Sequence, residues 1–171
     1  MSIPRPIVAA VGMLAIVVVG SEVAGLHLNH TASYPRGLWI ETSGSDDRLP
    51  YVLACADHVA DFETYKERGY LPWGMACSGT APLLKRIWAR PGDSWSVTPE
   101  GVVVNGELVS NTRPLEYDSA GRQLIPATGG TVPPGHVLLL SDYSPRSLDG
   151  RYFGTMPITQ VLKEVKPLWT E

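Results

Sequence analysis

Hydrophobic positions divide the chain into one long apolar stretch at the N-terminus and a series of short segments after it. Residues 7–20 form an unbroken run of apolar residues and glycine, preceded by Arg5. A helix over this run would be about 21 Å long, short of the roughly 30 Å hydrocarbon core of a bilayer. Extending it to residue 28 makes it long enough, but takes in Glu22 and His27. A buried core helix is disfavoured because the run has no polar face.

Two interpretations of this stretch stay open. One is a retained membrane anchor; the other is a cleaved secretory signal, for which the small residues 23–25 offer a weak cleavage site. In both, Arg5 and the amino terminus stay inside, so the bulk of the chain lies outside the cytoplasm. The pattern therefore predicts an anchor or signal segment over residues 1–28 and a folded domain over residues 29–171.

The segments of the folded domain are short and have β character. Apolar runs bounded by turn residues predict strands at residues 37–40, 51–54, 83–89, 137–140 and 158–165. A hairpin is expected over residues 102–109, because Asn105 and Gly106 accept the positive φ angles of a type I′ turn. One helix is expected, over residues 57–68, with Asp57 as its cap and Gly69 at its end.

Composition narrows the class of protein. Charged residues make up 18% of the chain, and 17 Gly and 15 Pro supply many turns, which disfavours a helical bundle, a coiled coil and a disordered chain. A formal net charge of -3 disfavours a nucleic-acid-binding domain with a broad basic surface. We therefore expect a mostly β domain with antiparallel strands and one short helix, behind an N-terminal transmembrane or signal helix.

The two cysteines, Cys55 and Cys77, are far enough apart in sequence to close a sizeable loop. An oxidising compartment would permit a disulfide between them, and the alternative is two unrelated buried thiols. A zinc site is disfavoured: Cys55 and His58 have ligand-like spacing, but no second well-spaced pair accompanies them.

Three segments carry residues of chemical interest: residues 29–39, 82–86 and 141–154. Residues 31–39 read TASYPRGLW, residues 85–93 read KRIWARPGD, and residues 147–154 read SLDGRYFG. In this order they resemble the boxes of the Ser/Lys signal peptidase family. The likeness is nearest to its TraF-type conjugative-transfer proteases, whose boxes are T-x-S-x-P-x-G-L/I-Y/W, K-R-x-x-x-x-P-G-D and S-x-D-S/G-R-x-x-G. Tyr34 stands where the general signal peptidases have Met, which favours the conjugation subgroup.

The resemblance implies a role for each matching residue. Ser33 would be the nucleophile and Lys85 the general base, with Ser147 hydrogen-bonding to the lysine and orienting it. The Thr31 hydroxyl and the Ser33 backbone N–H would form the oxyanion hole.

The resemblance also covers a charged pair near the third box. Asp149 and Arg151 would support Ser147; the alternative is a surface ion pair of little energetic value. Asp142 has a counterpart in the family, and its role stays open.

The chemistry of a serine and a lysine can be argued from the residues themselves. A serine hydroxyl is a poor nucleophile until a base removes its proton, and the three boxes contain no histidine. Lysine can act as the base only as the neutral amine, so its pKa must fall from about 10.4 towards neutrality. A drop of about three units corresponds to about 4 kcal/mol and requires a desolvated site. Alternation puts Leu83, Lys85 and Ile87 on one strand face, but does not show which face is buried.

The resemblance implies a membrane-associated serine endopeptidase in the periplasm, anchored in the inner membrane by the N-terminal helix. Its partner would be a pilin precursor, or another peptide presented at the membrane, which it would cleave or cyclise without a metal or other cofactor. Residues 70–75 are an apolar stretch that would either dip into the membrane interface or pack on its own domain. The rival functions are a general type I signal peptidase, a self-cleaving repressor domain and a non-catalytic periplasmic component of the transfer apparatus.

Overall fold

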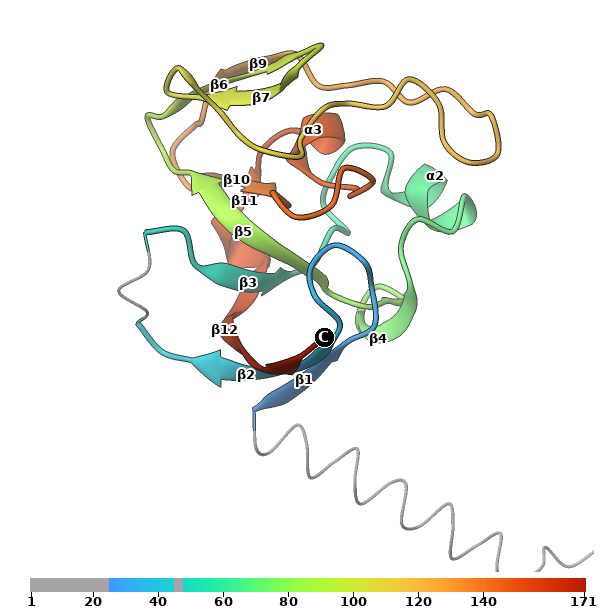
Figure 1. Ribbon diagram of the computed structural model, residues 1–171, viewed down its shortest axis with the longest axis vertical. Helices are drawn as coiled ribbons and strands as arrows, with labels where there is room; N and C mark the ends of the chain where they lie inside the picture. The colour runs from blue at the N-terminus through green and yellow to red at the C-terminus, as the bar shows by residue number, and fades with distance from the viewer. Residues whose placement is uncertain (1–24, 45–47) are drawn as a thin grey trace, which may run out of the picture.

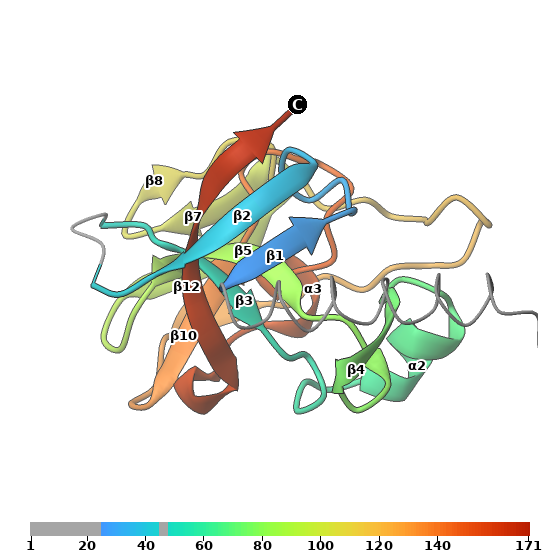
Figure 2. The same cartoon turned by 90° about the horizontal axis from the view of Figure 1, so that it is seen from below.

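The computed structural model describes residues 25–44 and 48–171, which form two antiparallel β-sheets joined by a shared core (Figure 1). The larger sheet has seven strands in the order β1-β2-β12-β3-β5-β10-β11. Figure 2 shows β1, β2 and β12 side by side at one edge of this sheet. The strands are β1 (Leu26–Asn29), β2 (Gly37–Thr42), β3 (Tyr51–Ala54), β5 (Leu83–Ala89), β10 (His136–Leu140), β11 (Met156–Pro157) and β12 (Val161–Thr170).

The smaller sheet follows β5 and has the strand order β8-β7-β6-β9. A long excursion, residues 109–128, leaves this sheet between β8 and β9 and runs out towards helix α2 (Phe62–Glu67) (Figure 1). The strands are β6 (Ser94–Thr98), β7 (Gly101–Val104), β8 (Glu107–Leu108) and β9 (Gly129–Thr131).

An apolar cluster joins the two sheets. Leu138 and Leu140 of β10 pack in one buried cluster with Trp95 of β6 and Val102 of β7. Because burial of such side chains is the main favourable term in folding, this cluster fixes the smaller sheet against β5 and β10. The carboxyl end of β10, which residues 141–154 follow directly, is therefore held firmly.

Most of the strands expected from sequence are confirmed. The bounds of β3 and β5 match the predicted ones, and the predicted hairpin is formed by β7 and β8. Asn105 and Gly106 at its turn have φ of 50° and 85°, as a type I′ turn requires. The last predicted strand is shifted: residues 158–160 form a 3₁₀ turn, and β12 begins at Val161.

The helix predictions were partly wrong. Helix α2 begins at Phe62, not after Asp57, whose carboxylate accepts a hydrogen bond from Ser78 Oγ at 2.7 Å. A second short helix, α3 (Gly150–Phe153), was not expected, because Asp149-Gly150 also fits a simple turn. Asp149 caps α3, its side chain accepting from Arg151 N at 3.2 Å.

The described N-terminal part begins as sheet, not as helix. Strand β1 starts at Leu26 and therefore crosses the predicted boundary after residue 28. Among the described residues, no helix is long and apolar enough to cross a membrane. The predicted anchor or signal helix over residues 7–20 lies outside the described residues.

The two cysteines form a disulfide, with Cα atoms 5.2 Å apart. It joins the segment after β3 to the end of β4 (Trp73–Cys77). Between them lies helix α2, whose Phe62 and Tyr65 pack on Leu71 and Leu83. The disulfide and this small apolar cluster together hold the α2–β4 region against the start of β5.

Candidate active site

The loop between β1 and β2 carries Ser33 and is braced by Asn29, the last residue of β1. The buried Asn29 amide donates to the carbonyl oxygens of Thr31, Tyr34 and Pro35 at 3.2, 3.0 and 3.1 Å. Its Oδ1 accepts hydrogen bonds from the Thr31 backbone N and Oγ1, at 3.1 and 2.8 Å. One side chain thus pairs backbone groups that so short a loop cannot pair by itself.

Asn29 also bears on the role expected for Thr31. Because the Thr31 hydroxyl donates to Asn29 Oδ1, its proton is already engaged in a hydrogen bond. The hydroxyl would have to rotate before it could act as an oxyanion donor.

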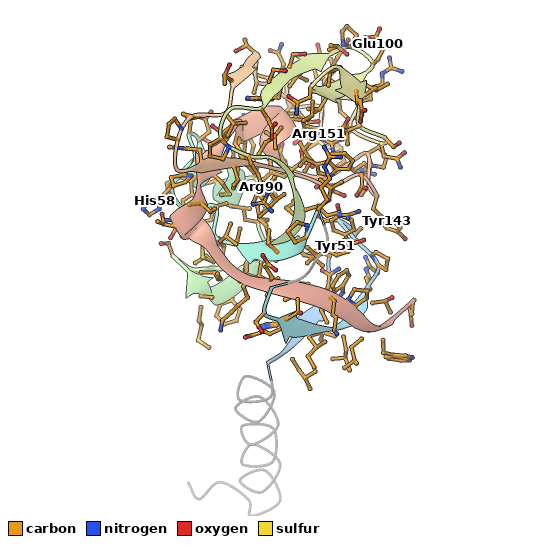
Figure 3. All side chains as sticks on the ribbon, turned by 90° about the vertical axis from the view of Figure 1, so that its left-hand side faces the viewer. Tyr51, His58, Arg90, Glu100, Tyr143 and Arg151 are labelled. Carbon is orange, nitrogen blue, oxygen red and sulfur yellow. A yellow bond between two sulfur atoms is a disulfide. The ribbon has the colours of Figure 1, made fainter. Side chains whose placement is uncertain are left out.

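Tyr34, next to Ser33, is buried and ties the loop to the end of β10. Its hydroxyl donates to Asp142 Oδ1 at 2.6 Å and lies 3.3 Å from the Leu140 carbonyl oxygen. Its ring packs edge-on against Tyr51 and stacks on Tyr143, both of which are labelled in Figure 3. Burial, together with the Asp142 carboxylate, raises the pKa of Tyr34 far above its usual value, so the phenol stays a hydrogen-bond donor.

Lys85 lies in the middle of β5, and its side chain is 1% exposed. The strand face that it shares with Leu83 and Ile87 is the buried one, which the alternation pattern alone did not show. Its partner across the β3–β5 pair is the fully buried Val52. Burial lowers the pKa of Lys85 from 10.5 to about 8, with the Asp149 charge opposing the shift and the Arg151 charge adding to it.

Lys85 Nζ and Ser33 Oγ are hydrogen-bonded at 2.8 Å, although the two residues are 52 positions apart in sequence. This distance lies within the range in which a base can take a proton directly from a hydroxyl. With its pKa near 8, the lysine is neutral in an appreciable fraction of molecules at neutral pH. The pair therefore has the geometry and the electrostatics of an activated serine.

Ser147 lies near this pair but does not make the expected hydrogen bond to the lysine. Its side chain is 3% exposed, and its Oγ has no hydrogen-bond partner among the described residues. A buried hydroxyl without a partner costs about 1–3 kcal/mol, and such groups are concentrated at functional sites. Ser147 lines the same cavity as Ser33 and Lys85, so a bound molecule could reach it.

Asp149 and Arg151 form a buried ion pair, not a surface one. Both side chains are 0% exposed, and Arg151 donates from Nε and Nη2 to the two Asp149 oxygens at 2.8 Å each. Their further bonds go to backbone groups of Ser141, Asn111 and Pro145, and none goes to Ser147. The pair holds the loop that precedes Ser147, and supports Ser147 only through that loop; Figure 3 labels Arg151.

A cavity of about 860 Å³ opens beside Ser33 and Lys85. The excursion forms part of its wall and is held there by two contacts with the α2 region: the Tyr70 hydroxyl donates to Asp118, and Arg122 Nη2 donates to the Arg68 carbonyl oxygen at 3.3 Å. The wall residues are mostly apolar or aromatic, with Tyr70, Pro72, Leu83, Leu84, Leu115, Tyr117, Leu124, Leu148 and Tyr152 among them.

Within residues 25–44 and 48–171, no three His, Cys, Asp or Glu side chains are grouped as ligands for a metal ion.

A second cavity, of about 670 Å³, is also lined by the excursion and shares Leu115, Tyr117 and Leu124 with the first. Neither Ser33 nor Lys85 lines it.

The match to a protein family identifies the class of protein. The sequence matches the family model described as signal peptidase, peptidase S26, over residues 6–169. The chain therefore belongs to the S26 signal peptidase family, which places it in general among the serine peptidases.

The chain is also similar to individual proteins. The chain is 36% identical over 166 residues to a plasmid transfer protein TraF of Escherichia coli, covering 96% of this chain and 93% of that protein. It is 35% identical over 176 residues to a conjugal transfer protein TraF of Agrobacterium fabrum, covering 97% of both. A solved structure of a signal peptidase I from Enterococcus faecalis covers 73% of this chain and 100% of that chain, with 19% identity and a TM-score of 0.43.

The buried lysine predicts a pH-dependent gain in stability when it is replaced by methionine. Below pH 8 the lysine is charged in both the folded and unfolded states, and its burial disfavours folding by about 3 kcal/mol. Between about pH 8 and 10.5 the unfolded state binds more protons, so wild-type stability rises with pH through this window. Lys85→Met should therefore be up to about 3 kcal/mol more stable at pH 6–7, with the difference shrinking towards pH 10.

Denaturant unfolding of the full chain in detergent at pH 6, 8 and 10 measures this difference. Lys66→Met, which replaces an exposed lysine on α2, is the matched control and should show no comparable gain. A Lys85→Met protein that is less stable than wild type at pH 6, or a difference that does not vary with pH, would contradict the burial of a charged amine.

Proposed function

We propose that this protein is a membrane-associated serine endopeptidase of a conjugative transfer system, which processes a pilin precursor through an acyl-enzyme on Ser33 with Lys85 as general base. The observation that carries the proposal is the hydrogen bond of 2.8 Å between Ser33 Oγ and a lysine amine that is 1% exposed. The conjugative context rests on the similarity to the TraF proteins of E. coli and A. fabrum.

The first half of the reaction needs only the serine and the lysine. The neutral Lys85 amine takes the Ser33 proton as Oγ attacks the scissile carbonyl carbon of the substrate. When the tetrahedral intermediate collapses, the peptide C–N bond breaks, and the Lys85 ammonium returns the proton to the departing amine. The products are an ester on Ser33 and a released peptide with a free amino end.

The negative charge of the tetrahedral intermediate needs donors beside Ser33. The Ser33 backbone N–H is one candidate, and the Thr31 hydroxyl becomes a second if it turns away from Asn29. The unpaired hydroxyl of Ser147, in the same cavity, is available to hold the lysine amine once substrate excludes water.

The cavity suits an extended peptide with apolar side chains. Its volume of about 860 Å³ and its aromatic and aliphatic walls would bury several side chains at once. Removing water from the cavity would also keep the Lys85 amine neutral, because desolvation is the main cause of its lowered pKa.

The second half of the reaction decides between two products. Water can attack the ester, which gives a linear product with a free carboxyl end. Alternatively, the amino terminus of the bound precursor can attack, which forms a new amide bond and closes a ring. Both routes use the same serine, lysine and oxyanion donors and differ only in which nucleophile reaches the ester.

Replacing either member of the pair should abolish processing. With a pilin-like precursor encoded beside this gene and expressed together with it, Ser33→Ala and Lys85→Ala should each lower the processing rate by more than about 1,000-fold. Intact-mass spectrometry of the precursor and its product makes the measurement. A cyclic product is one water mass lighter than the linear product of the same cleavage.

The controls are chosen to match the replaced residues. Lys66→Ala and Ser96→Ala remove a lysine and a serine outside the cavity lining and should leave processing unchanged. Processing retained by Ser33→Ala would overturn the nucleophile, and a non-catalytic role would then explain the fold. Processing of many unrelated leader peptides would favour a general signal peptidase instead.

We further propose that the protein lies in the periplasm and is held at the inner membrane by the apolar residues 7–20. Leu28, Leu38 and Trp169 support this placement, because they lie opposite one another on the neighbouring strands β1, β2 and β12. Leu28 and Trp169 are each 69% exposed, and Trp and Leu are typical of surfaces that meet a bilayer interface. Trp73 and Met75 of β4 are more exposed still.

Membrane fractionation tests the anchor. The full chain should stay in the pellet after an alkaline carbonate wash, and deletion of residues 7–20 behind a cleavable export signal should move it to the soluble fraction. Intact mass of the mature protein separates the alternatives, because a retained anchor keeps residues 1–24. A soluble mature protein that lacks them would contradict the anchor and show a cleaved signal.

A further inference from the structure

A second hydroxyl group, that of Ser141, contacts the backbone of Ser33 from the end of β10. Ser141 is 0% exposed, and its Oγ donates a hydrogen bond of 2.5 Å to the Ser33 carbonyl oxygen. The same Oγ accepts hydrogen bonds from the backbone N–H groups of Tyr143 and Ser144, at 3.3 and 3.1 Å. The hydroxyl proton therefore has a fixed direction, towards the carbonyl group of Ser33.

The backbone of Ser141 is held as firmly as its side chain. Its N–H donates to Asp149 Oδ2 at 3.0 Å, and its carbonyl oxygen accepts from Arg151 Nη2 at 3.0 Å. Because this ion pair is fully buried, its hydrogen bonds are shielded from competing water. Ser141 is thus the residue through which the pair reaches Ser33.

A second connection joins the residues that follow Ser33 and Ser141, which are Tyr34 and Asp142. The Tyr34 hydroxyl bonds to Asp142 at 2.6 Å, so two adjacent residues of the β1–β2 loop are tied to two adjacent residues after β10. The Ser33–Tyr34 peptide unit is consequently held at both ends. The residues that hold it, Ser141 and Asp142, are more than 100 positions away in sequence.

We propose that Ser141 is a positioning residue for the nucleophile: by holding the Ser33 carbonyl group, it keeps the Ser33 side chain aimed at the Lys85 amine. This inference rests on the proposed peptidase function and adds a role to it. It also assigns Asp149 and Arg151 a task that differs from support of Ser147, since their contacts lead to Ser141.

The physical reason is that Asn29 and Tyr34 brace the residues on either side of Ser33, whereas the Ser33 carbonyl group itself is held by Ser141. The Ser33 Oγ is hydrogen-bonded to Lys85 Nζ and lines the cavity. If the Ser33–Tyr34 peptide is free to rotate, the Cα–Cβ bond changes direction and Oγ moves away from the amine. A displacement of about 1 Å can lower a rate by about 100-fold.

The test is a comparison of Ser141→Ala with Thr112→Val in the full-length protein. Thr112 is the matched control because its buried hydroxyl also donates to a carbonyl, Val109 O at 2.6 Å, and accepts from a backbone N–H, that of Val102 at 2.8 Å. The substrate is a fluorogenic peptide that spans the junction cut in the processing experiment above. Both variants should lose a similar few degrees of Tm, since each loses the same kinds of hydrogen bond.

The kinetic constants distinguish positioning from folding. Ser141→Ala should lower kcat by about 10- to 100-fold and change KM by less than about twofold, because the cavity walls that bind substrate are unchanged. The pH at which the rate is half-maximal should stay at the wild-type value, because the burial of Lys85 is unaltered. Thr112→Val should keep the wild-type kcat.

A second variant covers the case in which Ser141→Ala folds poorly. Ser141→Cys replaces the hydroxyl by a slightly larger thiol, which is a weak donor, and should also lower kcat with KM nearly unchanged. A wild-type kcat in Ser141→Cys, or equal losses of kcat in Ser141→Ala and Thr112→Val, would overturn the inference. Failure of the proposed function would be seen in a different result: the Ser33→Ala variant would still process the precursor.

Discussion

A lysine amine kept out of water beside a serine hydroxyl is the interaction on which this structure depends. Lys85 is 1% exposed, and burying its charge opposes folding at neutral pH. The surrounding strands offset that cost by burying apolar side chains, with Val52 on β3 and Leu139 on β10 packing around Ile87. The protein therefore gives up stability at one position to hold a base that can be neutral near pH 8.

The same constraint explains why polar groups are buried elsewhere in the site. The β1–β2 loop and the loop after β10 do not form sheet, so their backbone groups need side-chain partners. Asn29 serves the first loop, and Asp149, Arg151 and Ser141 serve the second. Buried networks of this kind are rigid when every member is paired. Ser147 is the exception, since its hydroxyl lacks a partner among the described residues, and it lies where substrate would bind.

The sequence predicts the elements that are determined by their own residues, and misses those that depend on contacts with distant parts of the chain. Residues 51–54 and 83–89 are continuous apolar runs between turn residues, and both proved to be strands with the predicted bounds. Strand β9 (Gly129–Thr131) was missed because two of its three residues are glycine, and only pairing with β6 makes it a strand.

The same distinction between local and long-range causes holds for the residues of the site. Ser33 and Lys85 were found because they stand in boxes that resemble a known family, and the structure places them 2.8 Å apart. Asn29 and Ser141 begin two of the segments singled out from sequence but were given no role, because each acts through backbone atoms that only the folded chain brings near. The burial of Asp149 and Arg151 could not be predicted from the sequence either, since a D-x-R pair fits a solvent-exposed turn equally well.

The most direct test of this account is the pKa of Lys85 itself. The chain has four lysines, so the side-chain NMR signals of Lys85 in the full-length protein in detergent can be assigned by comparison with Lys85→Met. The account predicts that these signals titrate with a pKa of about 8, well below those of an ordinary lysine, because the amine is desolvated. A Lys85 pKa of about 10 or higher would mean that the amine is charged at neutral pH, and would contradict its role as the base for Ser33.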